Sequence, residues 1–211
     1  ARNEVDITYV LAEKSSSQIQ LQGGWGANRI VGSLNLVFDN FSTQNILNRK
    51  SWSPLPSGDG QRLSLSASSN GAYYQNYNVS FTEPWLGGKK PNALTISVYK
   101  SVSSNGQEGD NREAIEILGL TVGIGKRLKN PDDYFTIYNG INFQQYKLIN
   151  SQSFFSFKDG FSNNVNYNIR LGRNSVDQLI FPRRGFNHPI TLEGVSEIGK
   201  DEISISNLFK N

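Results

Sequence analysis

The chain contains a series of segments, each about ten residues long, in which apolar side chains alternate with small or polar ones. In residues 30–38 one set comprises Ile30, Leu34, Leu36 and Phe38, and the other comprises Val31, Ser33, Asn35 and Val37. Because successive side chains of a strand point to opposite faces, this pattern predicts a strand and excludes a helix. About 9 to 11 tilted residues cross a bilayer, whereas strands of soluble proteins average about 5 to 6. The repeat therefore predicts a transmembrane β-barrel.

The alternation recurs often enough to predict about nine antiparallel strands. They are expected at residues 18–25, 30–38, 61–69, 73–82, 94–99, 118–125, 135–143, 165–171 and 186–192. Residues 40–60 contain Pro54, Pro56 and three closely spaced turn residues, so we expect an irregular insertion there. Single-chain bacterial barrels generally have an even number of strands, and an open edge leaves backbone groups unpaired in lipid. The expected fold is therefore all-β, as part of a larger barrel.

Composition agrees with this fold and argues against several other classes. A mean hydropathy of −0.46, without a run of eighteen apolar residues, excludes a helical membrane protein but is compatible with a barrel that has a polar interior. The net charge of +3 is too small and too dispersed to indicate nucleic-acid binding. The sequence has no Cys, hence no disulfide or thiolate metal site, and no Met, so we expect it to begin within a longer exported precursor.

The sequence indicates no enzyme. His188, the single histidine, falls in an expected strand beside Pro189, so a catalytic triad or a histidine-rich zinc site is not expected. Glu83 and the Asp132-Asp133 pair lie beside prolines, where turn chemistry explains them. The glycines of residues 119–125 lack the Lys-Ser or Lys-Thr end of a phosphate loop. We therefore predict no catalytic residue, metal ligand or cofactor.

Several segments carry a resemblance to a known family. Residues 5–14 resemble the closing strand of a POTRA domain, and the segment after them resembles the start of the barrel in the BamA family of outer-membrane assembly factors. Two further segments are similar to periplasmic turns of that family, with the matching residues Phe81, Thr82, Glu83, Pro84 and Trp85 in one and Phe181, Pro182, Arg183 and Gly185 in the other. Residues 85–91 resemble the Bacteroidota variety of this turn.

The resemblance implies a division of the chain. Residues 1–13 would end the last POTRA domain, residues 14–195 would form the N-terminal half of the transmembrane barrel, and residues 196–211 stay unassigned, with a further strand as one option. Arg184-Gly185-Phe186 imitates the Arg-Gly-Phe signature of the family's sixth extracellular loop. That signature lies several strands later in the family, so we do not equate the two.

The resemblance also implies a function without a nucleophile. The first strand would be a lateral gate to which a client strand adds through main-chain hydrogen bonds, and its residues are Gln18, Ile19, Gln20, Leu21, Gln22, Gly23, Gly24 and Trp25. The implied partners are outer-membrane lipid, unfolded β-barrel clients and accessory lipoproteins of an assembly complex, without nucleic acid.

The implied location is the cell outer membrane, with the N-terminal end periplasmic. The connections in residues 40–60, 83–92, 126–133 and 173–185 would then be periplasmic, and those in residues 26–29, 69–72, 101–112 and 150–164 extracellular. Two alternatives stay open: a related translocation or secretion pore or passive porin-like channel, and a soluble ligand-binding β-sandwich. Strand length and the outward hydrophobic residues weigh against the sandwich.

Overall fold

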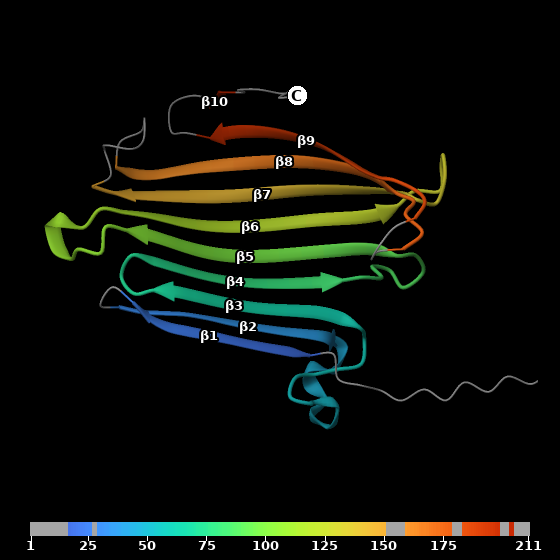
Figure 1. The fold of residues 1–211 in the computed structure, drawn as a ribbon, viewed down its shortest axis with the longest axis horizontal. Helices are drawn as coiled ribbons and strands as arrows, with labels where there is room; N and C mark the ends of the chain where they lie inside the picture. The colour runs from blue at the N-terminus through green and yellow to red at the C-terminus, as the bar shows by residue number, and fades with distance from the viewer. Residues whose placement is uncertain (1–16, 27–28, 151–158, 179–182, 199–202, 205–211) are drawn as a thin grey trace, which may run out of the picture.

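The computed structural model describes residues 17–26, 29–150, 159–178, 183–198 and 203–204. They form one antiparallel sheet in which each strand pairs with the next along the chain (Figure 1). The strands are β1 (Gln18–Gly26), β2 (Arg29–Phe41), β3 (Gln61–Asn70), β4 (Tyr74–Glu83), β5 (Asn92–Ser104), β6 (Ala114–Arg127), β7 (Phe135–Ile149), β8 (Gly160–Asn174), β9 (Asn187–Ile198) and the short β10 (Ile203–Ser204). The all-β antiparallel fold is thus confirmed.

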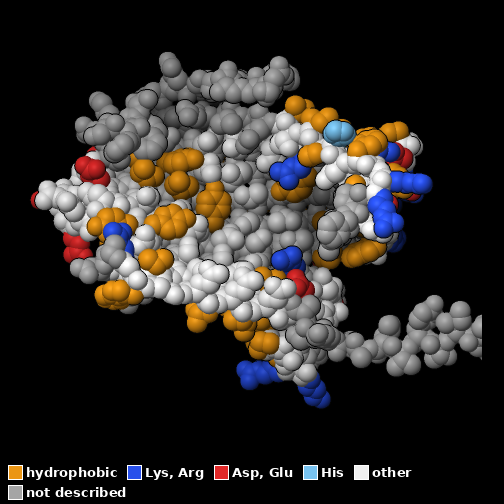
Figure 2. All heavy atoms as spheres, viewed as in Figure 1, with side chains coloured by type: hydrophobic (Ala, Val, Ile, Leu, Met, Phe, Trp, Pro, Cys, Tyr) orange, Lys and Arg blue, Asp and Glu red, His pale blue; other side chains and the backbone are white. Residues whose placement is uncertain are grey.

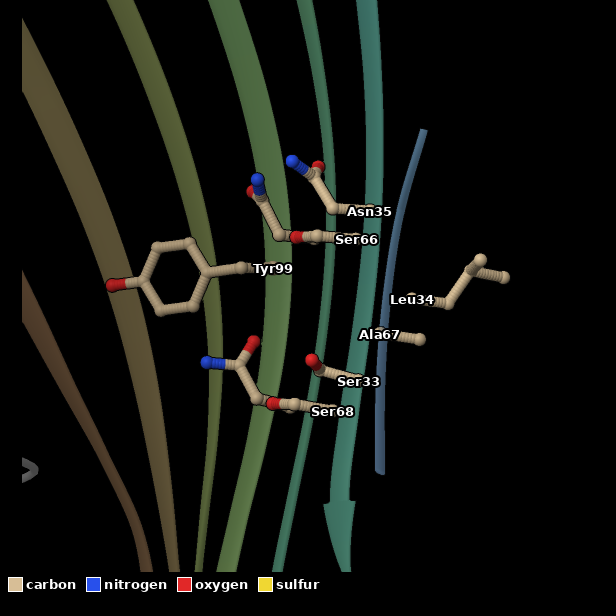
Figure 3. A pocket seen from close by; sticks show the side chains of 9 residues that line it. Ser33, Leu34, Asn35, Ser66, Ala67, Ser68 and Tyr99 are labelled. Atoms are coloured by element: carbon tan, nitrogen blue, oxygen red, sulfur yellow. The ribbon is translucent and has the colours of Figure 1, made fainter. Parts of the chain in front are cut away.

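The strand pairing gives the sheet one apolar and one polar face. Val98 lies opposite Leu120, which in turn lies opposite Phe143, so one apolar row crosses three strands. Figure 3 shows the two faces directly, because Leu34 and Ala67 point to one side of the sheet while Ser33, Ser66 and Tyr99 point to the other. The alternation predicted for residues 30–38 and 118–125 therefore corresponds to the two faces of a continuous sheet.

The apolar face is exposed along most of the strands. Large side chains at least a third exposed occur from β1 to β9, including Leu21, Leu34, Val98, Leu120, Ile141 and Leu192. Among the described residues, the buried hydrophobic side chains are only Val37, Phe38, Val102, Ala114 and Leu148. Water-exposed proteins rarely leave so extensive an apolar surface uncovered, whereas a membrane barrel presents such a surface to lipid. The sheet therefore has the surface of a membrane protein.

Several strands are longer than the alternation predicts: β6 begins at Ala114, β7 continues to Ile149 and β8 begins at Gly160. The alternation predicts a last strand ending near Leu192, but β9 continues to Ile198, where it lies opposite Asn163 of β8. Residues 193–198 include two glutamates and a glycine, which conceal the pattern. Pairing there uses main-chain groups and needs no apolar side chain.

Connections between strands gather at two opposite ends of the sheet. Those joining β2 to β3, β4 to β5, β6 to β7 and β8 to β9 lie together at the right in Figure 1, and β1 begins at the same end. The β2–β3 connection contains two 3₁₀ helices, η1 (Gln44–Leu47) and η2 (Arg49–Ser51), and η3 (Gly109–Asn111) lies between β5 and β6 at the other end. None of the helices in the described ranges is long and apolar enough to cross a membrane.

The β2–β3 connection is irregular, as predicted, yet closely hydrogen-bonded. Ser42 is fully buried, and its hydroxyl donates to the Asp59 carboxylate at 2.5 Å and accepts the Asn45 backbone N–H at 3.0 Å. The Gln61 side chain, also buried, accepts the Thr43 N–H at 2.8 Å. These bonds join both ends of the insertion, so it forms a defined structure beside the sheet.

Candidate functional site

The first candidate site is the edge formed by β1. All nine of its residues pair with β2, from Gln18 opposite Val37 to Gly26 opposite Arg29. Within the described ranges β1 has no second neighbour, because β1 and β10 are the two margins of the sheet. Every residue of β1 is exposed. An edge strand of this kind presents backbone N–H and C=O groups to which another extended segment can add.

The side chains of β1 continue both faces of the sheet. Ile19, Leu21 and Trp25 extend the apolar face and are 72%, 78% and 73% exposed. On the other face, Gln20 accepts a hydrogen bond from Asn35 at 3.4 Å. A Cβ added at Gly24 would meet nothing within 4 Å. Gly23 and Gly24 thus have no side chains to pack against β2, and interior glycine also weakens a strand through backbone entropy.

The second predicted element, residues 81–85, is a turn built around Glu83. One oxygen of its carboxylate accepts the Gln61 amide at 2.7 Å, and the other accepts the Trp85 N–H at 2.9 Å. Gly87 has a φ of 83°, in the left-handed region that glycine adopts readily. The adjacent Trp85 is 53% exposed, which suits an aromatic residue at a membrane interface. Glu83 therefore joins β3 to the β4–β5 turn.

The third predicted element lies in the β8–β9 connection. Phe181 and Pro182 lie outside the described residues. The Asp177 carboxylate accepts the N–H groups of Arg183 and Arg184 at 3.0 and 3.1 Å. These hydrogen bonds, that of Arg184 first, hold the pKa of Asp177 below its usual value of 3.8.

Gly185 occupies a position that requires glycine. Its φ is 94°, and an added Cβ would collide with the backbone of Ser175 and Val176. The neighbouring Phe186 N–H donates to the Ser175 hydroxyl at 3.2 Å. The Arg184-Gly185-Phe186 tripeptide therefore closes the connection between β8 and β9.

The structure places the predicted site elements in different parts of the sheet. The turns of residues 81–85 and 183–185 lie at the end of the sheet where β1 begins, whereas the unpaired side of β1 runs along the whole strand (Figure 1). These turn residues make structural contacts within their own connections. Among the predicted site elements, the β1 edge is the one with backbone N–H and C=O groups that face no second strand within the described residues.

Sequence reasoning missed an ion pair that ties two turns together. Arg173, at the end of β8, donates to the Asp132 carboxylate at 2.8 and 3.1 Å. The Arg173 guanidinium also lies 4.4 Å from the centre of the Phe186 ring. The hydrogen bond from Arg173 is the main cause that lowers the pKa of Asp132 below 3.8. The two residues are far apart in sequence, so only the pairing of β7 with β8 could have indicated this contact.

The polar face carries a second feature that the sequence did not reveal, because two tyrosine rings lie over glycines of β6. An added Cβ at Gly119 would collide with the Tyr99 ring, and one at Gly123 would collide with the Tyr138 ring. Tyr99 also accepts a hydrogen bond from the Gln144 amide at 2.5 Å. It lines a hollow of about 350 Å³ together with small polar side chains of β2, β3 and β4 (Figure 3). These glycines therefore make room for aromatic rings.

Comparison with known proteins identifies the family. The model of the Omp85 superfamily domain matches residues 57–208, most of the chain. The chain belongs to the Omp85 superfamily. It is accordingly part of an outer-membrane β-barrel, and members of this superfamily are generally non-enzymatic membrane proteins. In the described part of this Omp85 chain, no three His, Asp or Glu side chains are grouped closely enough to hold a metal ion.

A solved structure shows the same fold. The Omp85 chain is similar to BamA from Haemophilus ducreyi lacking POTRA domains 1–3, with a TM-score of 0.55 and 17% sequence identity. The similarity covers 88% of the chain and 35% of the BamA structure, so the chain spans about a third of that protein. No curated protein sequence matches the chain significantly. The sheet therefore corresponds to part of a larger Omp85 barrel.

Proposed function

We infer that this chain forms the N-terminal half of the barrel of an outer-membrane assembly factor, which folds and inserts client β-barrel proteins. The observation that carries the proposal is the edge of β1, exposed along all nine residues and paired on one side only among the described residues. In a bilayer such an edge is costly unless its backbone groups are hydrogen-bonded. A client strand that adds to β1 would supply those bonds, with its apolar side chains continuing the lipid-facing surface of Leu21 and Leu34.

The proposal includes an orientation and a domain arrangement. We place the end where β1 begins in the periplasm, with residues 1–13 as the end of a POTRA domain and residues 14–195 as barrel. The connections at this end contain Lys89, Lys90, Arg183 and Arg184, and the exposed Trp85 lies among them. The proposed partners are outer-membrane lipid, unfolded clients and accessory lipoproteins. The arrangement follows the resemblance to BamA assembly factors.

The test introduces proline at successive positions of β1 in the complete protein. In an antiparallel edge strand, alternate N–H groups point toward the neighbour and toward the free side, so Leu21→Pro and Gln22→Pro remove bonds on opposite sides of β1. We expect that whichever of the two proline variants removes an N–H group on the free side of β1 slows client assembly, while its barrel still inserts. Leu21→Val and Gln22→Thr are matched controls that retain the N–H and are expected to be tolerated.

Client assembly is measured by the heat-dependent gel mobility of a newly folded client barrel, after insertion of each variant has been checked in the same way. If both inserted proline variants assemble clients at the normal rate, strand addition at β1 is wrong. The polar inner face, with its hollow of about 350 Å³, then favours the alternative, a translocation or secretion pore or a passive channel.

A further inference from the structure

A notch with four basic side chains lies between two neighbouring connections at one end of the sheet. Its volume is about 420 Å³. Its lining comprises Lys90 and Pro91 before β5, Asn92 as the first residue of β5, Lys126 and Arg127 as the last residues of β6, and Leu128, Lys129, Asn130 and Asp133 after β6. Asn92 lies directly opposite Lys126, which brings the β4–β5 and β6–β7 connections side by side. We call this set of residues the basic notch.

The backbone around the basic notch is fixed by hydrogen bonds. The Leu86 N–H donates to the Asn92 carbonyl at 2.9 Å and closes the β4–β5 connection. The Leu128 N–H donates to the Phe135 carbonyl at 2.8 Å and closes the β6–β7 connection. The cationic residues of the notch therefore lie at the ends of two paired strands and in the hydrogen-bonded connections beside them.

The charge of the basic notch is poorly compensated within the described residues. Its lining has four cationic side chains and one carboxylate, that of Asp133. The three ion pairs among the described residues involve other cations, and the neighbouring Asp132 is bound to Arg173. Like charges that share a site repel each other, so a bound anion would be stabilised there. Figure 2 shows Lys and Arg side chains gathered at this same end of the sheet.

The basic notch lies next to the end of the apolar face of the sheet. Ile124 on β6 is an exposed residue of the lipid-facing surface, and Lys126 follows it on the same face two residues later. Trp85 and Leu86, in the adjoining connection, are 53% and 41% exposed. Tryptophan and the long stems of lysine are favoured at the boundary between hydrocarbon and headgroups. In an Omp85 barrel, this position places the notch at headgroup depth.

We propose that the basic notch binds the phosphate of an anionic phospholipid in the adjoining leaflet. Lys90, Lys126 and Lys129 supply point charges for a phosphate diester, whereas Arg127 follows Lys126 in β6 and therefore points to the opposite face of the sheet. The acyl chains would lie along the apolar face beyond Ile124, so the lipid, and not free phosphate, matches both parts of the site. This proposal needs only a barrel in a bilayer and is independent of client assembly.

The test compares two double variants of the complete protein in nanodiscs. Lys126→Gln with Lys129→Gln removes two charges from the notch, and Arg49→Gln with Lys50→Gln removes two exposed charges from the β2–β3 connection at the same end. Binding of spin-labelled phosphatidylglycerol is measured against a background of phosphatidylcholine. Each cation near a membrane surface contributes about 1 kcal/mol, so the notch variant should bind about thirtyfold more weakly, and the control should bind as the wild type does.

Equal binding by the notch variant and the control would overturn the proposal. Displacement of the labelled lipid by millimolar glycerol phosphate would also overturn it, because the site would then recognise a soluble phosphate. If the first notch variant does not insert, Lys90→Gln with Lys129→Gln replaces it, since both residues are exposed and lie outside the strands. The same thirtyfold weakening is expected there, and unchanged binding is the contrary result.

Discussion

Replacing Gly119 by alanine tests whether the glycines of β6 are needed to seat aromatic rings. The added Cβ would lie 2.2 Å from the nearest atom of the Tyr99 ring, so the ring must then move. Overpacking of this kind costs about 1 to 3 kcal/mol, and a displaced Tyr99 would also lose the hydrogen bond from Gln144, worth about 0.5 to 1.5 kcal/mol. Alanine restores about 0.4 to 1 kcal/mol by restricting the unfolded chain. We therefore expect a net loss of about 2 kcal/mol.

Gly125 is a matched control on the same strand and the same face. A Cβ there would meet its nearest neighbours, which include Ala93 and Tyr138, at 3.9 Å, an ordinary contact distance. Gly125→Ala should therefore range from neutral to about 1 kcal/mol more stable. The free energy of unfolding is measured by urea titration in lipid vesicles, with the folded fraction read from heat-dependent gel mobility.

A third variant separates the ring contact from any effect on the strand itself. In a Tyr99→Ala background, Gly119→Ala should cost nothing further, because the ring that it meets is absent. If Gly119→Ala is as stable as Gly125→Ala, or if its cost persists without Tyr99, the reasoning from the ring contact is refuted.

Two further predictions concern the turns and the lipid-facing surface. The folded-state pKa of Asp132 is lowered, so its ion pair with Arg173 stabilises the fold above pH 3.8, and this stabilisation is lost as the pH falls through the lowered pKa. In the Arg173→Gln variant, the free energy of unfolding should therefore fall less on acidification. An equal decrease in wild type and variant would contradict the assignment. With cysteine at Leu120 or Thr121, a lipid-confined maleimide should label position 120 several times faster, and equal or inverted labelling would contradict the assignment of faces.

The sequence was sufficient to predict the class of fold and the two faces. The alternation around Leu34 and Leu120 depends only on the period of a strand, which is local information. The end of β9 was missed because Glu193 and Glu197 interrupt the apolar pattern, although main-chain pairing continues to Ile198. Prediction thus succeeded where side-chain periodicity decided the structure and failed where backbone pairing alone decided it.

The contacts of the candidate site were less predictable than the strands. The residues of β1 and of the turn at Glu83 could be singled out, but the bond from Gln61 to Glu83 joins residues of different strands. The same holds for Arg173 and Asp132. Such pairs depend on the length and closure of each connection, which the pattern of one strand does not contain.

The seating of Tyr99 over Gly119 has a consequence for how β5 finds its partner. A slip of two residues between β5 and β6 would keep each side chain on the face that it already occupies, so hydrophobicity alone does not oppose it. The slip would set Tyr99 opposite Ile117 or Thr121, both of which carry a Cβ where Gly119 leaves space. The two registers place the same polar and apolar side chains on each face, so only steric fit distinguishes them. Gly119 therefore helps to select the register in which β5 pairs with β6.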